Sequence, residues 1–518
     1  MKKTIVYSGF VLFFALTAIV YGALLSRTPV YLNQDELGFA LNAYSIAQTG
    51  FDDNNRFFPL YFWHLGVMWA TPIIVYATAL VLRFLPLTEG MIRLPSVFVG
   101  LLDIFLVWIL AGKIFKEKIY VFLAGFLLAT TPVHFIHSRI LLDNLFVIPF
   151  VILWLILLSL FIKEGRIVDL GLGFFVLGVG VHSYHAAKIM MPLYIFLTIW
   201  VLWSQVKNNK KLLGVVLVSF LLPLLPFIPW LSKYPDTLID QVKYTQLYDA
   251  KLNPLVGVLS LLTPRSLLHR VDVYVNYFNP KFLFLRGDAS LIHSTQKTGV
   301  LLFPLAIFVP LGIFSALRKW EPLEKILVAG FFTAPIAATI AGDHYRISRA
   351  LFILPFAVIL ATYGVKFLFS LRSRKCQVLG LVLLFAIPLQ GFYFLYDYFT
   401  DYRLRSYSWF NNNVPGALES IIKYDRQQSL VHVYFDKTID FLPSYWKFYL
   451  IKHDRRDLLW KTEFFDPKFV DTELLPQNTL LLYSHHNVDG QKQSIGQFNK
   501  LDPIFEPDGV QKLYLYKN

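Results

Sequence analysis

Long apolar runs restrict what this chain can fold into. Eleven segments approach or reach the roughly 20 residues that a helix needs to cross a bilayer. They lie near residues 5–25, 92–112, 119–136, 144–162, 168–185, 188–204, 211–232, 299–317, 324–341, 349–370 and 376–394. Hydrophobic residues make up 56% of the 518 residues and charged residues 16%, whereas soluble domains are roughly 45–50% apolar and about 25% charged. The sequence therefore predicts a polytopic α-helical membrane protein.

A twelfth apolar segment, residues 62–85, leaves the topology open until the charges are considered. It contains Pro72, so it could lie along the membrane instead of crossing it. If it does not cross, most basic loops fall on the side of Lys2 and Lys3, which the positive-inside rule makes cytoplasmic. We therefore expect eleven spans and a cytoplasmic N-terminus in the plasma or inner membrane. The excess of Lys and Arg behind the net charge of +14 is therefore interpreted as a sign of topology, and no nucleic-acid partner is expected.

This topology leaves three regions on the extracytoplasmic side. Residues 26–91 and 233–298 form two long outer loops, and residues 395–518 form a tail long enough for a small domain. In the tail, strand-like runs alternate with helix-like stretches. The strand-like runs are 430–435, 480–483 and 513–516, and the helix-like stretches lie near 415–424 and 443–452. We predict a transmembrane module over residues 1–394 and an extracytoplasmic α/β domain over residues 395–518.

Two adjacent acids, Asp35 and Glu36, stand at the start of a predicted helix in the first outer loop. Apolar residues at helical spacing predict an amphipathic helix on the membrane surface. Two interpretations stay open. Asn33 as N-cap and Glu36 at position N3 would form a capping box, which accounts for Glu36 better than for Asp35. Alternatively, a carboxylate at the water–lipid boundary could take a proton from an acceptor hydroxyl or amine.

Three further polar clusters fall on the same predicted side of the membrane. Arg139 and Asp143 follow the third helix and are spaced to share one helical face, where a structural ion pair is the alternative to a functional role. The first of these clusters also contains His137. The second cluster contains His182, Tyr184, His185 and Lys188, and the third contains His344, Arg346 and Arg349. Carboxylates, histidines and permanent cations beside lipid suit a substrate with an anionic phosphate head and an apolar tail. Each cation alone could instead anchor a lipid headgroup.

Four motifs, in order along the chain, resemble those of GT-C glycosyltransferases. The pair Asp35-Glu36 and the segment 89–96, which opens the next helix, resemble signatures of that superfamily. Residues 137–144 are similar to the second acidic motif of the branch that contains protein O-mannosyltransferases and the aminoarabinose transferase of lipid A. Residues 277–288 resemble a loop found in many prokaryotic members. The similarity covers roughly residues 1–390.

The resemblance implies a GT-C fold and an inverting transferase that moves a sugar from a polyprenyl-phosphate donor to an extracytoplasmic acceptor. Asp35 matches the position of the catalytic base and Asp143 that of the second acid, which orients the acceptor or a metal where one is used. Glu36 is a third catalytic candidate. The candidate donor-phosphate ligands are Arg139, His182, Lys188, His344, Arg346 and Arg349. Further candidate pocket residues are Arg93, His137, Tyr184 and His185.

No cofactor or metal is expected, and His134 and His137 without a clear third ligand are a weak metal signal. The partners expected are the lipid-linked donor and membrane lipids. The acceptor, whether protein, lipid or glycan, is left open. The nearest alternative is a flippase or polymerase of lipid-linked sugars. A secondary transporter is a more distant one, because the charged residues lie at helix ends rather than at a midplane break. A purely structural role would leave position 35 tolerant of substitution.

Overall fold

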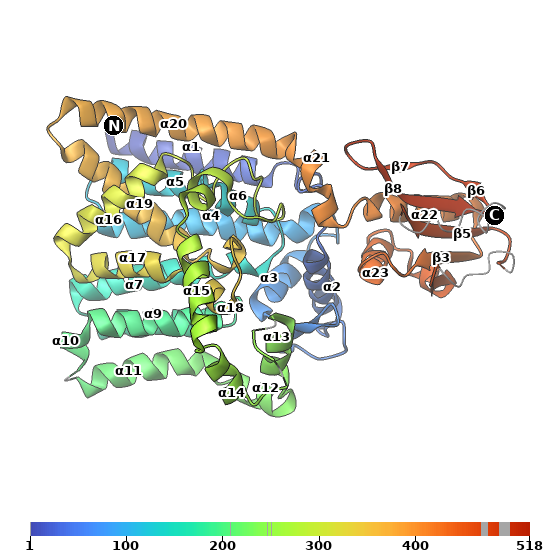
Figure 1. The fold of residues 1–518 in the computed structure, drawn as a ribbon, viewed down its shortest axis with the longest axis horizontal. Coiled ribbons are helices and arrows are strands. Elements are labelled where there is room, and N and C mark those ends of the chain that lie inside the picture. The colour runs from blue at the N-terminus through green and yellow to red at the C-terminus, as the bar shows by residue number, and fades with distance from the viewer. Residues whose placement is uncertain (1, 208, 246, 250, 468–474, 486–497) are drawn as a thin grey trace.

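The computed structural model describes the whole chain except residues 1, 208, 246, 250, 468–474 and 486–497. A bundle of apolar helices carries a smaller sheet-containing region at one end (Figure 1). The bundle is built from α1 (Lys2–Gly22), α4 (Glu89–Ile114), α5 (Lys118–Ala129), α6 (Pro132–His137), α7 (Ile148–Glu164), α8 (Ile167–Gly180), α9 (Ala187–Val201), α10 (Trp203–Val206), α11 (Lys210–Leu221), α12 (Phe227–Lys233), α16 (Leu305–Lys319), α17 (Pro322–Thr333), α18 (Ile336–Ala341), α19 (Ile353–Ser370) and α20 (Arg374–Phe399). The N-terminus lies at the end of the bundle opposite the sheet-containing region.

Several of these helices can cross a membrane, which confirms a multi-pass membrane protein. In the described part of the chain five are long and apolar enough, and a pair bent by 43°, Lys210–Leu224 with Phe227–Lys233, makes a sixth. The five are Glu89–Ile114, Asp143–Glu164, Pro322–Ala341, Ile353–Ser370 and Arg374–Phe399. Other apolar helices are shorter; α5 has 12 residues, about 18 Å at 1.5 Å per residue. The number eleven therefore stays a prediction.

The ambiguous segment 62–85 does not form one continuous helix. Its first residues pair as an antiparallel hairpin of β1 (Phe62–His64) and β2 (Met68–Ala70). The rest forms α3 (Pro72–Leu82), which begins with a proline at its first position, where the missing N–H costs nothing. Its 11 residues span about 16 Å, roughly half of the hydrocarbon core. The segment is thus a hairpin followed by a short apolar helix, and its placement outside the membrane core stays a prediction.

The helix that begins with the two acids is α2 (Gln34–Thr49), and its first turn has the predicted cap. Asn33 accepts from the backbone of the first turn, and the Glu36 carboxylate accepts from the Asn33 backbone N–H at 2.9 Å. The helix is more buried than a surface helix should be, since Glu36 to Ala43 are all inaccessible. It lies between α3 and α23 (Leu442–Lys452) of the C-terminal region, which cover faces that would otherwise meet lipid or water.

The C-terminal region is a small α/β unit, as predicted. Its sheet has the strand order β4-β3-β5-β8-β6, with β7 beside β8; β3 runs parallel to β4 and β5, and β8 is antiparallel to β5. The elements are α21 (Tyr402–Ser406), α22 (Val414–Gln428), β3 (His432–Asp436), α23, β4 (Thr462–Phe465), β5 (Thr479–Ser484), β6 (Asn499–Lys500), β7 (Ile504–Phe505) and β8 (Gln511–Lys517). The predicted strands and helices of the tail correspond to β3, β5, β8, α22 and α23.

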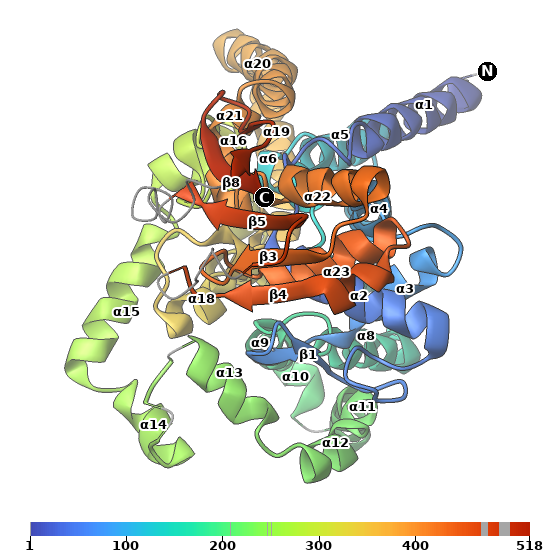
Figure 2. The ribbon, with the colours of Figure 1, turned by 90° about the vertical axis from the view of Figure 1, so that its right-hand side faces the viewer.

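The described residues of the second predicted outer loop are mostly helical and arch along one side of the end that carries the C-terminal region (Figure 2). The loop contains α13 (Thr237–Thr245), α14 (Pro254–Ser260), α15 (Pro264–Asn276) and the π-helix η3 (Lys281–Arg286). Two short 3₁₀ turns, η1 (Asp143–Leu145) and η4 (Ile347–Arg349), complete the elements that matter for the site.

Candidate active site

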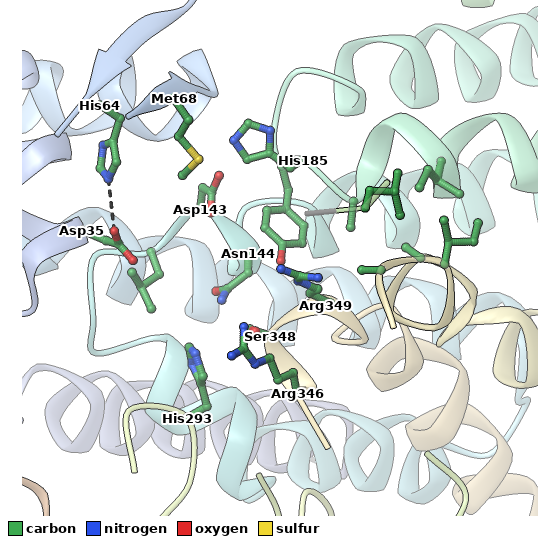
Figure 3. A pocket seen from close by; sticks show the side chains of 18 of the residues that line it. Asp35, His64, Met68, Asp143, Asn144, His185, His293, Arg346, Ser348 and Arg349 are labelled. Atoms are coloured by element: carbon green, nitrogen blue, oxygen red, sulfur yellow. Dashed lines mark hydrogen bonds and ion pairs between the residues drawn. The ribbon is translucent and has the colours of Figure 1, made fainter. Parts of the chain in front are cut away.

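A pocket of about 280 Å³ brings together residues from distant parts of the chain. Its wall is formed by the start of α2, the β1–β2 hairpin, η1, the segment between α8 and α9, and η4 (Figure 3). The polar side chains that line it are Asp35, His64, Asp143, Asn144, Tyr184, His185, His293, Arg346, Ser348 and Arg349. Six of the sequence-predicted candidates, Asp35, Asp143, Tyr184, His185, Arg346 and Arg349, are therefore together.

Asp35 reaches this pocket from the first turn of α2. Its side chain is 35% exposed, and its Oδ1 lies 3.2 Å from Nε2 of His64. The dashed line in Figure 3 marks this contact. His64 is almost fully buried, so it holds one carboxylate oxygen of Asp35 from the protein side. Asp35 is thus oriented but still accessible from the pocket.

His64 was missed by the sequence analysis, and the structure shows why it occupies this place. Its ring packs against Phe39 with centroids 4.5 Å apart. It also fills the space above Gly38, where an added Cβ would lie 2.5 Å from the ring. Asp35 and His64 are 29 residues apart, on a helix and a hairpin, so no local spacing in the sequence could have paired them.

Glu36 and Arg93 do not line the pocket, although they neighbour it in sequence. The Glu36 carboxylate is fully buried and receives two hydrogen bonds from the Arg93 guanidinium, at 2.7 and 2.9 Å, and a third from the Leu141 backbone. The remaining N–H groups of Arg93 donate to the backbone carbonyls of Leu25, Pro29 and Tyr31. Because every one of these groups is occupied, the geometry favours the structural interpretation of Glu36 over the catalytic one.

Asp143 lines the pocket, whereas Arg139 does not. The expectation that they share a helical face is wrong, because α6 ends at His137 and the chain turns before η1. The guanidinium of Arg139 is buried and donates to carbonyls of α1 and the following turn, including Tyr21 and Ala23. Asp143 instead accepts from the Thr71 hydroxyl at 3.0 Å. Arg139 therefore ties the end of α1 to the bundle.

Arg346 and Arg349 bring positive charge to the pocket. Arg346 is 58% exposed and lies 3.8 Å from Asp343, while Arg349 contacts the same carboxylate more closely. The loop that carries them is fixed by two residues of the second outer loop, within the predicted motif 277–288. Tyr277 donates to the carbonyls of Asp343 and Arg346.

Asp288 fixes the same loop through its carboxylate, which accepts from the Ile347 backbone N–H at 2.6 Å. Its other oxygen accepts from the Ser290 backbone N–H at 2.7 Å. Burial raises the pKa of Asp288 to about 7, although these two backbone hydrogen bonds oppose the rise. Tyr277 and Asp288 thus fix the backbone of the loop from which the side chains of Arg346 and Arg349 extend.

Buried histidines form the side of the pocket that His293 lines. His137 stacks on His293 with ring centroids 4.9 Å apart and planes 2° apart, and its Nδ1 contacts the Asn144 amide oxygen at 2.7 Å. Burial lowers the pKa of His137 to about 4 and that of His293 well below its usual value. Both rings are therefore neutral near pH 7, which permits the face-to-face stack. Asn144 was quoted in the acidic motif but was not singled out as a pocket residue.

Three other candidates lie outside the pocket. His182 is held between the Tyr61 hydroxyl and the Pro223 carbonyl. The Lys188 ammonium lies over the Tyr61 ring, 5.3 Å from its centroid. His344 pairs with Asp272 at 2.9 Å. These contacts place His182 and His344 in packing and loop structure, whereas Lys188 also lies close enough to Asp143 for their charges to interact.

The pocket thus has the Asp35 carboxylate at one side and guanidinium groups at the other. Figure 3 shows Asp35 and His64 on one side, Asp143 and Asn144 in the middle, and Arg346 and Arg349 on the far side. Such an arrangement can hold an anionic group at the arginines and accept a proton at the carboxylate. Within the described residues no group of three or more His, Cys, Asp or Glu could hold a metal ion.

Comparison with known families gives a match over part of the chain. The family model of the dolichyl-phosphate-mannose-protein mannosyltransferases matches residues 70–230. That stretch contains Thr71, Asp143, Tyr184 and His185 of the site, while Asp35 and the two arginines lie outside it. The curated proteins gave no match.

Solved structures share the fold over nearly the whole chain. ArnT from Cupriavidus metallidurans in the apo state is 14% identical and superposes with a TM-score of 0.56 over 98% of each chain. The same values hold for ArnT bound to undecaprenyl phosphate. The archaeal oligosaccharyltransferase AglB from Archaeoglobus fulgidus, in complex with an inhibitory peptide and a dolichol-phosphate, is also 14% identical, with a TM-score of 0.52 over 86% of this chain and 64% of that chain. The family match and the shared fold confirm the predicted membrane glycosyltransferase of the GT-C type.

Proposed function

We propose that this membrane glycosyltransferase transfers a sugar from a polyprenyl-phosphate donor, with inversion, to an acceptor outside the cytoplasm. The observation that carries the proposal is that an accessible carboxylate, Asp35, shares one pocket with Arg346 and Arg349. The donor class is further supported by two proteins of similar fold, which were captured with undecaprenyl phosphate and with a dolichol-phosphate.

In this mechanism Asp35 is the general base. The acceptor nucleophile attacks the anomeric carbon, and its proton passes to the free carboxylate oxygen of Asp35. The bond from the anomeric carbon to the phosphate oxygen breaks at the same time, and the electron pair leaves with the polyprenyl phosphate. His64 holds the second oxygen of Asp35 and so aims the base at the pocket. Attack from the side opposite the leaving phosphate inverts the anomeric centre.

The two arginines serve the leaving group. A guanidinium presents a fixed fork of donors to phosphate oxygens, and charge that grows on the leaving phosphate is stabilised where such donors are already in place. Asp143, which is held by Thr71 and lies between the two ends of the pocket, orients the acceptor. The sugar and the acceptor are not specified by these contacts.

We further propose that the pocket faces the extracytoplasmic side of the plasma or inner membrane and that the N-terminus is cytoplasmic. The chain begins at one end of the bundle and α20 leads into the C-terminal region at the other (Figure 1). An odd number of membrane crossings would place the N-terminus and the C-terminal region on opposite sides of the membrane. The basic loops favour the cytoplasm for the N-terminal end.

The arginines give the first test of the donor class. In lipid nanodiscs, Arg346→Gln and Arg349→Gln should each weaken binding of polyprenyl phosphate by about 10- to 100-fold, since a hydrogen bond to a charged group contributes roughly 1.5–3 kcal/mol. Arg349→Lys should restore only part of the affinity, because lysine lacks the planar fork. Arg318→Gln is the matched control, since Arg318 lies at the far end of α16 and does not line the pocket. Unchanged affinity in both pocket variants would reject this phosphate site.

A further inference from the structure

The C-terminal region touches the chain immediately before Asp35. Tyr445, a fully buried residue of α23, donates its hydroxyl to the Leu32 carbonyl at 2.5 Å. Tyr31 donates its hydroxyl to Glu506 at 3.0 Å. Glu506 is itself nearly buried and also accepts from the Asn413 backbone at 2.8 Å. Side chains 445 and 506 thus fix residues 31 and 32, three to four positions before the proposed base.

The bundle holds the same segment from the other side. Arg93 donates to the Tyr31 carbonyl at 2.6 Å and pairs with Glu36. Residues 31–36 are therefore clamped between a transmembrane helix and the C-terminal region. On the bundle side this clamp is a buried ion pair, in which Arg93 donates to Glu36 and to backbone carbonyls. Neither Tyr445 nor Glu506 lines the pocket.

We propose that Tyr445 and Glu506 are positioning residues for Asp35, so that docking of the C-terminal region sets the rate of sugar transfer without contacting the donor. The inference rests on the proposed role of Asp35 as base. It follows from the geometry of the clamp: the Leu32 carbonyl and the Tyr31 side chain determine where the cap at Asn33 begins, and the cap determines where Asp35 points. A displacement of about 1 Å in a catalytic group can cost about 100-fold in rate.

The same helix offers a matched control. Tyr449 lies one turn after Tyr445 on α23, is equally buried, and donates its hydroxyl to Glu89 of α4 at 2.7 Å. Tyr445→Phe and Tyr449→Phe each remove one buried hydroxyl from the contact between the two parts of the molecule. Only Tyr445→Phe releases the segment that leads to Asp35. A purely structural contact would make the two variants alike.

The test measures single-turnover transfer from radiolabelled polyprenyl-phosphate mannose in membranes that carry the native acceptor, and polyprenyl-phosphate binding in nanodiscs. Tyr445→Phe should slow transfer by about 10- to 100-fold and leave the affinity for polyprenyl phosphate unchanged. Tyr31→Phe should slow it less, because the Tyr445 contact remains. Tyr449→Phe should transfer at the wild-type rate, with a thermal unfolding midpoint equal to that of Tyr445→Phe.

Equal rates in the two α23 variants, or a Tyr445→Phe defect confined to donor affinity, would overturn the inference. Asp35→Asn, measured alongside, separates it from the proposed function. If Asp35→Asn loses transfer while Tyr445→Phe and Tyr31→Phe do not, only the positioning role is wrong. If Asp35→Asn transfers normally, the base assignment itself fails.

Discussion

Two pairs of arginines at the end of the bundle that carries the C-terminal region differ in what their guanidinium groups contact. Arg93 and Arg139 are buried, and both donate to several backbone carbonyls of residues 20–31. Arg346 and Arg349 share one carboxylate, that of Asp343, and line the pocket. The first pair shapes the loop after α1, whereas the second pair has donors available for a ligand. Residue type alone does not distinguish a structural arginine from one that can bind a ligand. The number of acceptors that its guanidinium group already contacts does.

Asp35 and Glu36, which are adjacent in the sequence, show the same contrast between a pocket residue and a structural one. Glu36 is buried and its carboxylate accepts four hydrogen bonds, from Arg93, Leu141 and Asn33, while Asp35 is partly exposed and contacts His64. On a helix, successive side chains point about 100° apart, so one acid can face the core while the next faces the pocket. Changing each acid in turn separates a loss of stability from a loss of chemistry.

The largest effect on stability is expected for Glu36→Gln. From the capping box alone we would expect a mild change, because glutamine also closes such a box. The pairing with Arg93 alters that expectation, since removing one charge of a buried pair costs about 3–5 kcal/mol. Chemical or thermal unfolding in detergent micelles should show this loss. Stability near that of the wild type would mean that the negative charge of Glu36 is not required to keep Arg93 buried.

A smaller effect, on rate rather than on stability, is expected for Gly38→Ala. A Cβ at position 38 would meet the His64 ring at 2.5 Å, so the ring must move away from Asp35, and transfer should slow by about tenfold. Helix propensity works in the opposite direction, since alanine is favoured over glycine by about 1 kcal/mol. Gly391→Ala on α20 is the control, because nothing lies within 4 Å of its added Cβ. Equal transfer rates would show that His64 does not aim the base.

Local patterns in the sequence predicted much of the fold. Apolar length predicted the membrane helices, strand-like runs in the tail predicted β3, β5 and β8, and the spacing of Asn33 and Glu36 predicted the cap of α2. Each of these signals depends on residues that are close in the chain. Charge counting favoured a non-spanning 62–85, and that part of the topology stays a prediction.

The pocket could be predicted only in part, because its assembly depends on contacts between distant segments. Asp35, Asp143 and the two arginines were found as isolated polar clusters. His64 and Thr71 were missed because each meets its acid only after the hairpin folds onto α2 and η1. Arg139 was placed with Asp143 by helical spacing, but the helix ends before that spacing applies. The i, i+4 spacing places two residues on one face only within a helix, and here the helix ends before Arg139.

The central claim is that Asp35 acts as a base and not as a helix-capping acid. Asparagine suits a helix start and keeps the shape of the side chain, but it cannot accept the proton. The most direct measurement is single-turnover transfer by Asp35→Asn, with polyprenyl-phosphate binding and thermal unfolding measured on the same preparation. The account predicts unchanged binding and unfolding and a rate lower by about 10²- to 10⁴-fold. Transfer near the wild-type rate would contradict it and make Asp143 the base to examine.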